Sequence, residues 1–174
     1  MTEQQIKSNI REVPDFPKKG ILFYDITTAL SEPQCTQWFA NNITEHYRNM
    51  QITKVLGIES RGFIIGSIVA RDLNAGFVPV RKPGKLPYCT ISESYRKEYG
   101  IDTIEIHADA INKDDVVLIH DDLLATGGTL AAAVRLVQKM GVKKIYVNTL
   151  IELDDLKGRN MFAPDMDIYS LIHY

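Results

Sequence analysis

Short apolar runs alternate along the chain with longer segments of helical periodicity, and no other feature of the sequence constrains the fold as strongly. Runs typical of buried strands occupy residues 52–58, 76–81, 116–119 and 143–151. Helical patterns occupy residues 31–47, 63–73 and 130–140, the first with Ser31 as its expected N-cap and Gln34 three residues later. Repeated strand–helix–strand units predict an α/β fold with a central, mostly parallel sheet flanked by helices. Ligands bind such sheets beyond the carboxyl ends of the strands, where the polar residues 59–62 and 120–129 fall.

The chain of 174 residues holds no internal repeat, low-complexity tract or linker, so we expect one domain over residues 1–174. A domain of this length removes roughly 68–70% of its unfolded surface from water, which is enough to fold without disulfides. Residues 82–106 interrupt the alternation with Pro83, Gly84, Pro87 and Gly100. An irregular stretch of about 20 residues in a compact domain is typically functional. We therefore expect a flap inserted at about residues 82–102.

The balance of 20 basic and 22 acidic residues argues against a protein that coats nucleic acid or an anionic membrane. Any anionic ligand must therefore meet a local basic patch. Cys35 and Cys89 have neither metal-ligand nor disulfide spacing, which favours a reducing, cytoplasmic environment. The polar residues 1–12 do not have the pattern of a signal peptide, and no apolar run approaches the ~18 residues of a membrane span.

The segment 116–129, VVLIHDDLLATGGT, carries the clearest chemical signal. Its apolar run is expected to end at His120, with a loop over residues 123–129 before the next helix. Two glycines and two threonines at such a turn let backbone N–H groups, hydroxyls and the helix dipole face a phosphate. Asp121 and Asp122 are unsuited to a phosphate but can accept hydrogen bonds from vicinal hydroxyls. Together these groups predict a site for a ribose 5-phosphate.

Other interpretations of this segment fit less well. A Gly-Gly pair alone is usually only a turn, and two adjacent acids alone are usually a solvated edge. A P-loop requires a lysine after the glycines, and a dinucleotide site requires Gly-x-Gly-x-x-Gly; neither pattern is present. A glycosidase-type carboxylate pair fits poorly because neighbouring residues at a strand end point to opposite sides.

The acidic pair followed by Ala-Thr-Gly-Gly-Thr resembles the phosphoribosyl diphosphate (PRPP) motif of the type I phosphoribosyltransferase family, and residues 121–129 are similar to its adenine-using members. Further similar strings lie in order along the chain: VPDFP at 13–17, GILF at 20–23 with Asp25 and Ile26, ESRGF at 59–63, RKPGKLP at 81–87, EYG at 98–100 and LKGR at 156–159. The resemblance implies that family's fold, and transfer of the 5-phosphoribosyl group from PRPP to adenine, giving AMP and pyrophosphate in purine salvage.

The resemblance also implies which residues hold PRPP. The 5-phosphate is held by a loop made of Ala125, Thr126, Gly127, Gly128 and Thr129. Asp121 and Asp122 contact the ribose. The pyrophosphate is met by a second loop, in which the family often has a non-proline cis peptide, and by basic residues at the start of the flap: Glu59, Ser60, Arg61, Gly62, Arg81, Lys82 and Lys85. Five Lys or Arg between residues 81 and 97 form the local basic patch that an anionic ligand needs. Without the family, Arg61 is equally compatible with a surface salt bridge.

On the same basis the flap is a hood over the active site, and Glu98 contacts N7 of adenine and assists proton transfer. Adenine lies near Leu22, Phe23 and Tyr24, although Phe23 alone is more typical of plain core. Two residues depart from the family. Tyr24 stands where the family usually has Arg, which puts that residue's ion pair in doubt. His120 stands where it usually has an aliphatic residue, as a satisfied strand-end group or one that perturbs Asp121.

Mg²⁺ carried by PRPP is the expected cofactor, with no direct protein ligand, since His46, His107 and His173 have no metal-ligand spacing. The expected partners are adenine, PRPP, AMP, pyrophosphate and a second copy in a homodimer, with no nucleic acid and no membrane. A 6-oxopurine transferase is the nearest alternative, against which Glu98 and residues 22–23 argue. A PRPP-sensing regulator would need a DNA-reading module, and only about 30 residues precede the first helix, without a recognition-helix pattern.

Overall fold

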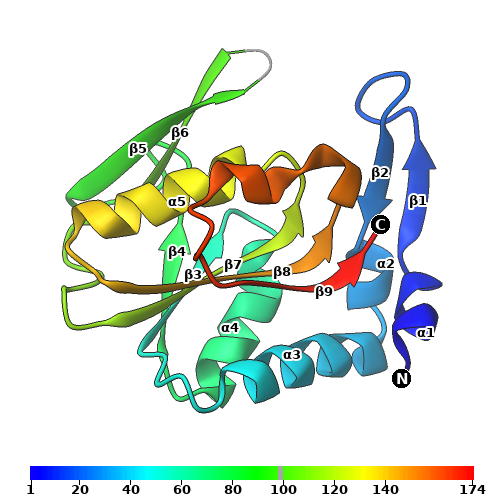
Figure 1. The fold of residues 1–174 in the computed structure, drawn as a ribbon, viewed down its shortest axis with the longest axis horizontal. Helices are drawn as coiled ribbons and strands as arrows, with labels where there is room; N and C mark the ends of the chain where they lie inside the picture. Colours follow the sequence, from blue (N-terminus) through cyan, green and yellow to red (C-terminus); the bar gives the residue numbers. More distant parts are fainter. Residues whose placement is uncertain (98–99) are drawn as a thin grey trace.

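Five parallel strands form the central sheet, in the order β4–β3–β7–β8–β9 (Figure 1). The computed structural model describes residues 1–97 and 100–174, with Lys97 described by its backbone alone. The strands are β3 (Lys54–Ile58), β4 (Gly76–Val80), β7 (Val116–Leu124), β8 (Lys144–Glu152) and β9 (Ile168–His173). The predicted α/β class with a parallel central sheet is confirmed.

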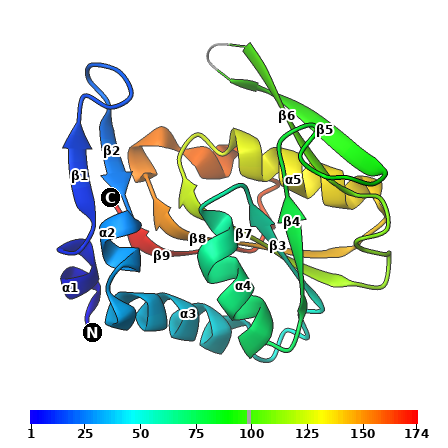
Figure 2. The same ribbon diagram turned by 180° about the vertical axis from the view of Figure 1, so that it is seen from behind.

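Helices cover both faces of this sheet, as Figures 1 and 2 show from opposite sides. α3 (Pro33–Tyr47) and α4 (Gly62–Asp72) pack on one face, and α5 (Gly128–Lys139) packs on the other. The apolar run at the start of β7 serves both layers, because alternate side chains of a strand point to opposite faces. Leu118 is buried with α3 and α4, whereas Val117 and Ile119 are buried with α5.

The expected Ser31 cap of the first long helix is wrong. A short helix, α2 (Thr27–Leu30), ends at Ser31, whose hydroxyl donates to the Thr28 carbonyl at 2.7 Å. The side chain is therefore used by the preceding turn, and α3 begins after Glu32 without a side-chain cap.

β7 is longer than its apolar run predicts. The strand continues through the acidic pair to Leu124 because β8 keeps pairing with it, through Asp121 opposite Thr149 and Leu124 opposite Glu152. His120 therefore lies within the strand rather than at its end. The predicted loop over residues 123–129 shrinks to residues 125–127, since α5 begins at Gly128.

The expected irregular flap is instead a regular antiparallel hairpin of β5 (Thr90–Lys97) and β6 (Gly100–His107). Tyr95, Ile104 and Ile106 belong to the core shared with α5, so the hairpin lies over that helix. Arg81 and Glu105 exchange two backbone hydrogen bonds of 2.9 and 2.8 Å, which join its second strand to the end of β4. The element ends at His107, beyond the expected boundary near residue 102.

The two ends of the chain lie on the same side of the molecule (Figure 1). α1 (Glu3–Lys7) precedes an antiparallel hairpin of β1 (Arg11–Pro14) and β2 (Leu22–Asp25). Lys7 Nζ donates to the carbonyl of His173 at 2.8 Å, which ties α1 to the end of β9. Two single-turn 3-10 helices, η1 (Asp154–Leu156) and η2 (Gly158–Met161), connect β8 to β9. Within the part of the chain that the structure describes, no helix has the length and apolar character needed to cross a bilayer.

Candidate active site at the carboxyl end of the sheet

A charged cavity of about 330 Å³ opens beyond the carboxyl ends of β3, β4 and β7. The six acids and bases that line it come from the segments after β3 and β4 and from β7 itself. Tyr95 and Thr129 close it from the β5–β6 hairpin and from α5. The full lining is Ile58, Glu59, Ser60, Arg61, Val80, Arg81, Lys82, Tyr95, Ile104, Asp121, Asp122 and Thr129.

Each basic side chain of this charged cavity is paired with an acid. Arg61 Nε donates to Asp122, and Lys82 Nζ donates to Asp102. Arg81 Nε donates to Glu59 at 2.9 Å, and this hydrogen bond is the main cause that lowers the pKa of Glu59. These contacts hold three cations at the rim of one cavity, where an anion of higher charge can exchange with the carboxylates.

The acidic pair occupies two different environments. Asp122 has a nearly buried side chain, 6% exposed, whose charge is balanced by Arg61. Burial and the charge of Asp122 raise the pKa of Asp121, and Arg61 only partly opposes them. A carboxyl whose charged form is disfavoured, next to one that is paired with Arg61, suits contacts to hydroxyls, which both accept and donate hydrogen bonds.

The segment between β7 and α5 has the geometry of an anion cradle. Gly127 is the N-cap of α5 with φ of +81°, a left-handed conformation that favours glycine. Among the described residues no side chain caps this helix end. The first N–H groups of the 12-residue helix therefore remain available to a ligand, and the helix dipole adds to their attraction for an anion.

A second, apolar cavity of about 670 Å³ adjoins the charged cavity. Tyr95 and Thr129 line both cavities. The other residues come from β2, the anion cradle, η1 and the end of the chain: Gly20, Ile21, Leu22, Tyr24, Arg96, Thr126, Gly128, Leu153, Asp155, Leu156 and Tyr174. A flat, mostly apolar ring enclosed here would lie next to an anion held at the start of α5.

Comparison with known proteins agrees with this geometry. Residues 27–172 match the model of the phosphoribosyl transferase domain. The chain is 56% identical over 172 residues to the adenine phosphoribosyltransferase of Bacteroides thetaiotaomicron, covering 99% of this chain and 98% of that protein. The chain belongs to the adenine phosphoribosyltransferase family. The reaction predicted from the sequence, adenine and PRPP to AMP and pyrophosphate, is the activity of this family and is confirmed for this enzyme.

Solved adenine phosphoribosyltransferases have the same fold. The enzyme from Rhodothermus marinus superposes with a TM-score of 0.93 at 49% identity, over 99% of this chain and 98% of that one. The enzyme from Giardia lamblia, complexed with 9-deazaadenine, superposes with a TM-score of 0.95 at 44% identity, over 100% and 98% of the two chains.

Most residues predicted from the resemblance to this family gather at the two cavities. Those lining the charged cavity are Glu59, Ser60, Arg61, Arg81, Lys82, Asp121, Asp122 and Thr129, and those lining the apolar cavity are Leu22, Tyr24, Thr126, Gly128 and again Thr129. Five others line neither cavity: Phe23, Gly62, Lys85, Ala125 and Gly127. Glu98 lies outside the described residues. The peptide bond between Glu59 and Ser60 is cis, as the resemblance implies.

Phe23 does not line the apolar cavity, although its neighbours Leu22 and Tyr24 do, as expected where successive side chains of a strand alternate between its faces. Its ring packs edge-on against Phe16, with centroids 5.2 Å apart, and the Arg61 guanidinium lies 5.3 Å from its centroid. Its neighbour Tyr24 instead stacks on Tyr174, with centroids 4.0 Å apart and an angle of 30° between the rings. Where the adenine phosphoribosyltransferase family usually has Arg, this enzyme therefore has an aromatic wall.

The sequence interpretation did not include Tyr95, Leu153, Leu156 or Tyr174 in the site. Leu156 begins LKGR, one of the strings that carry the family resemblance, and this string could have indicated that Leu156 lies at the site. Tyr174 follows β9, about 150 residues from Tyr24, and no local pattern connects two positions so far apart.

His120 is fully buried inside β7 and neutral. Burial lowers its pKa to about 4, although Asn148 and Asp122 oppose the shift. Its Nδ1 lies 2.7 Å from Asn148 Oδ1, and Asn148 donates to the Tyr169 carbonyl at 2.8 Å, so Nδ1 of His120 carries the proton. This hydrogen bond satisfies Nδ1 of His120, but Nε2 is buried and has no hydrogen-bond partner among the described residues. The structure therefore only half satisfies the strand residue that the sequence predicted.

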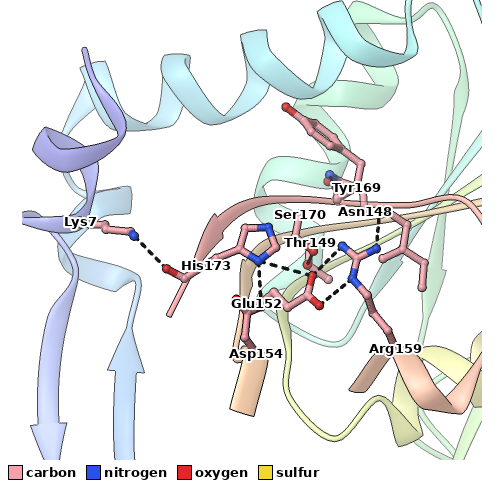
Figure 3. Close-up of polar contacts among 10 residues, drawn as sticks. Lys7, Asn148, Thr149, Glu152, Asp154, Arg159, Tyr169, Ser170 and His173 are labelled. Carbon is pink, nitrogen blue, oxygen red and sulfur yellow. Dashed lines mark hydrogen bonds and ion pairs between the residues drawn. The ribbon is translucent and has the colours of Figure 1, made fainter. Parts of the chain in front are cut away.

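Among the described residues, one group has the spacing of metal ligands: Glu152, Asp154 and His173, with ligand atoms within 4.8 Å of one another. Arg159 occupies both carboxylate oxygens of Glu152, at 2.7 and 2.8 Å (Figure 3). The Arg159 guanidinium neutralises the only buried carboxylate of this group, which weakens the attraction of the group for a divalent cation.

Proposed function

We propose that the two cavities divide the substrates of this adenine phosphoribosyltransferase. Residues 125–129 bind the 5-phosphate, Asp121 and Asp122 bind the ribose hydroxyls, and the charged cavity binds the pyrophosphate. Adenine binds in the apolar cavity, between Leu22 and Leu156. The observation that carries the proposal is the shared lining of Tyr95 and Thr129, since the bond between ribose and base must form where the two cavities meet.

Charge explains how this arrangement assists the reaction. Departure of pyrophosphate from C1 leaves positive charge on the ribose and builds negative charge on the leaving group. Arg61, Arg81 and Lys82 exchange their carboxylate partners for the leaving group and stabilise it there. Holding the 5-phosphate at the start of α5 keeps C1 in place while the base attacks.

Mg²⁺ fits this site as a companion of the substrate. Of the three carboxylates in the charged cavity, Glu59 and Asp122 are engaged by arginines, and the raised pKa of Asp121 disfavours its charged form. The diphosphate oxygens would then be the principal ligands of the metal, and the ion, when bound, would supply further neutralisation of the leaving group.

The β5–β6 hairpin is proposed as the hood that excludes water while adenine attacks, with Glu98 as the group that moves the N7 proton. The enzyme is further proposed to act as a cytoplasmic homodimer. The exposed thiol of Cys89 suits a reducing compartment, and large exposed apolar side chains such as Phe16 and Ile64 suit a protein interface. Light scattering of the purified protein tests the dimer.

A panel of bases tests the assignment of the apolar cavity. The enzyme with Mg²⁺ and PRPP is offered adenine, hypoxanthine, guanine, xanthine and orotate separately. AMP alone should form. A nucleotide formed from another base in the absence of AMP would overturn the assignment.

A further inference from the structure

Residues 156–159 are part of the resemblance to the family, yet Arg159 has no role in the proposed binding of PRPP and adenine. Its guanidinium points back at the last residue of β8 (Figure 3). Nε and Nη2 donate to the two carboxylate oxygens of Glu152, at 2.7 and 2.8 Å, and Nη1 donates to the Ile168 carbonyl at 3.1 Å. One side chain thus joins the end of β8 to the start of β9.

The Glu152–Arg159 ion pair is built to stay charged. The Glu152 side chain is 5% exposed, and burial alone would raise its pKa. Hydrogen bonds from Arg159 and Ser170, with the charges of Arg159 and His173, outweigh burial and lower the pKa. The same pairing raises the pKa of Arg159. A bidentate contact of this kind fixes the orientation of both partners.

The segment between these partners presses against the anion cradle backbone to backbone. A Cβ on Gly158 would lie 2.3 Å from the Ala125 carbonyl oxygen, and a Cβ on Gly127 would lie 2.4 Å from the Gly158 carbonyl oxygen. Leu153 N donates to the Leu124 carbonyl at 2.9 Å, which joins the same two segments at their other end. The path of residues 125–127 therefore depends on where residues 153–158 are held.

The same segment forms one wall of the apolar cavity, through Leu153, Asp155 and Leu156. The short connection between β8 and β9 thus contacts the anion cradle and also lines the apolar cavity. It holds few buried apolar side chains of its own, since Leu156 is 49% exposed and Met161 is 52% exposed. Leu153 packs against the core at the start of the connection, and polar contacts supply most of the remaining restraint.

We propose that Glu152 and Arg159 are positioning residues, which hold residues 153–161 in place. Gly158 then packs against the anion cradle, where the 5-phosphate is proposed to bind, and Leu156 forms part of the wall of the apolar cavity. The proposal rests on the assignment of residues 125–129 to the 5-phosphate. Neither side chain touches a substrate in this scheme. The ion pair acts through the backbone that it holds, and its loss weakens binding of PRPP and adenine together.

Three variants and two references test the proposal. Arg159→Lys keeps the charge opposite Glu152 but loses the bidentate contact, and Glu152→Gln combined with Arg159→Met removes the pair without stranding a buried charge. Gly158→Ala disturbs the same contact directly. Arg71→Met, which removes an exposed ion pair with Asp72, is the matched control, and Thr129→Val reports on the 5-phosphate loop itself.

The readouts are the affinity for ribose 5-phosphate by calorimetry, KM for PRPP and adenine, and the melting temperature. The double variant and Gly158→Ala should bind ribose 5-phosphate at least tenfold more weakly and raise both KM values. Arg159→Lys should fall between them and the control.

A merely structural pair would lower the melting temperature while the folded enzyme kept its affinities. Affinities within twofold of the parent in all three variants would therefore overturn the positioning role, provided that Thr129→Val weakens binding. If Thr129→Val also leaves the affinity unchanged, the 5-phosphate assignment falls, and the positioning proposal falls with it.

Discussion

The hydroxyl of Thr129 donates a hydrogen bond of 2.9 Å to the phenol oxygen of Tyr95. Tyr95 in turn donates to Asp102 at 3.1 Å, and Asp102 also accepts from Lys82. This chain of contacts joins the first turn of α5, both strands of the β5–β6 hairpin and the basic segment after β4. The wall between the charged and apolar cavities is therefore fixed by one buried phenol.

Tyr95→Phe should raise KM for PRPP about three- to tenfold, because it removes a hydrogen bond typically contributing about 0.5–1.5 kcal/mol. The ring and its packing remain, so the melting temperature should change little. Steady-state kinetics and thermal unfolding measure the two effects. Tyr88→Phe, on an exposed side chain, is the control. An unchanged KM for PRPP in Tyr95→Phe would contradict this role.

Tyr24→Ala should raise KM for adenine about three- to tenfold and leave KM for PRPP within twofold. The substitution removes the stacked pair with Tyr174, and such pairs contribute about 0.5–1.5 kcal/mol beyond their buried area. Tyr24→Phe keeps the stack and should behave like the parent. Initial rates at varied adenine and at varied PRPP separate the two constants. An equal rise in KM for adenine and KM for PRPP would mean that Tyr24 does not act through the apolar cavity.

His120 should make stability depend on pH between about 4 and 6.5. Its pKa is lowered to about 4 in the folded enzyme, below the ordinary value of 6.5, so the unfolded chain binds more protons in this window. The contribution is complete above pH 6.5 and is lost as the pH falls toward 4, by about 3 kcal/mol in all.

Urea unfolding at several pH values measures this effect. His120→Leu should flatten the pH dependence in the window, although it costs stability at pH 7 by leaving Asn148 without its partner. His46→Gln, at an exposed position on α3, should keep the slope of the parent. Parallel curves for the parent and His120→Leu would show that another group titrates.

Glu98→Ala should lower kcat by about 100-fold or more while the affinity for PRPP stays close to that of the parent, because general acid–base catalysis contributes about 10²–10⁴-fold. Single-turnover rates and PRPP binding are the measurements. Glu45→Gln, in an exposed ion pair on α3, is the control. Normal turnover of adenine by Glu98→Ala would mean that a different group moves the proton.

Local sequence patterns predicted the strands and helices whose periodicity reflects burial. The run before His120 is continuous because both faces of β7 are covered, and its interpretation as a parallel strand was confirmed. The end of the same strand was misplaced because pairing with β8 extends β7 through Asp121 and Asp122. Aspartate is a residue type with low propensity for strands, so the sequence predicted that the strand would end before this pair.

One polar residue, Glu93, prevented the sequence pattern from predicting the β5–β6 hairpin. Ile91, Glu93 and Tyr95 alternate along β5, and the inward-facing Glu93 breaks the apolar period. Its charge is met by Arg135 and Lys139 of α5, at 2.7 and 2.5 Å. A strand whose buried face is satisfied by ion pairs from a distant helix does not show the alternation that identifies strands.

The sequence by itself determined the α/β class and the family, and it predicted the two loops proposed to bind PRPP, because each is encoded in contiguous residues whose spacing has a direct chemical meaning. Only the tertiary structure decided that Tyr24 meets Tyr174, that Tyr95 separates two cavities, and that Gly158 lies against Ala125. These contacts join segments from distant parts of the chain, and their geometry follows from the packing of the whole sheet.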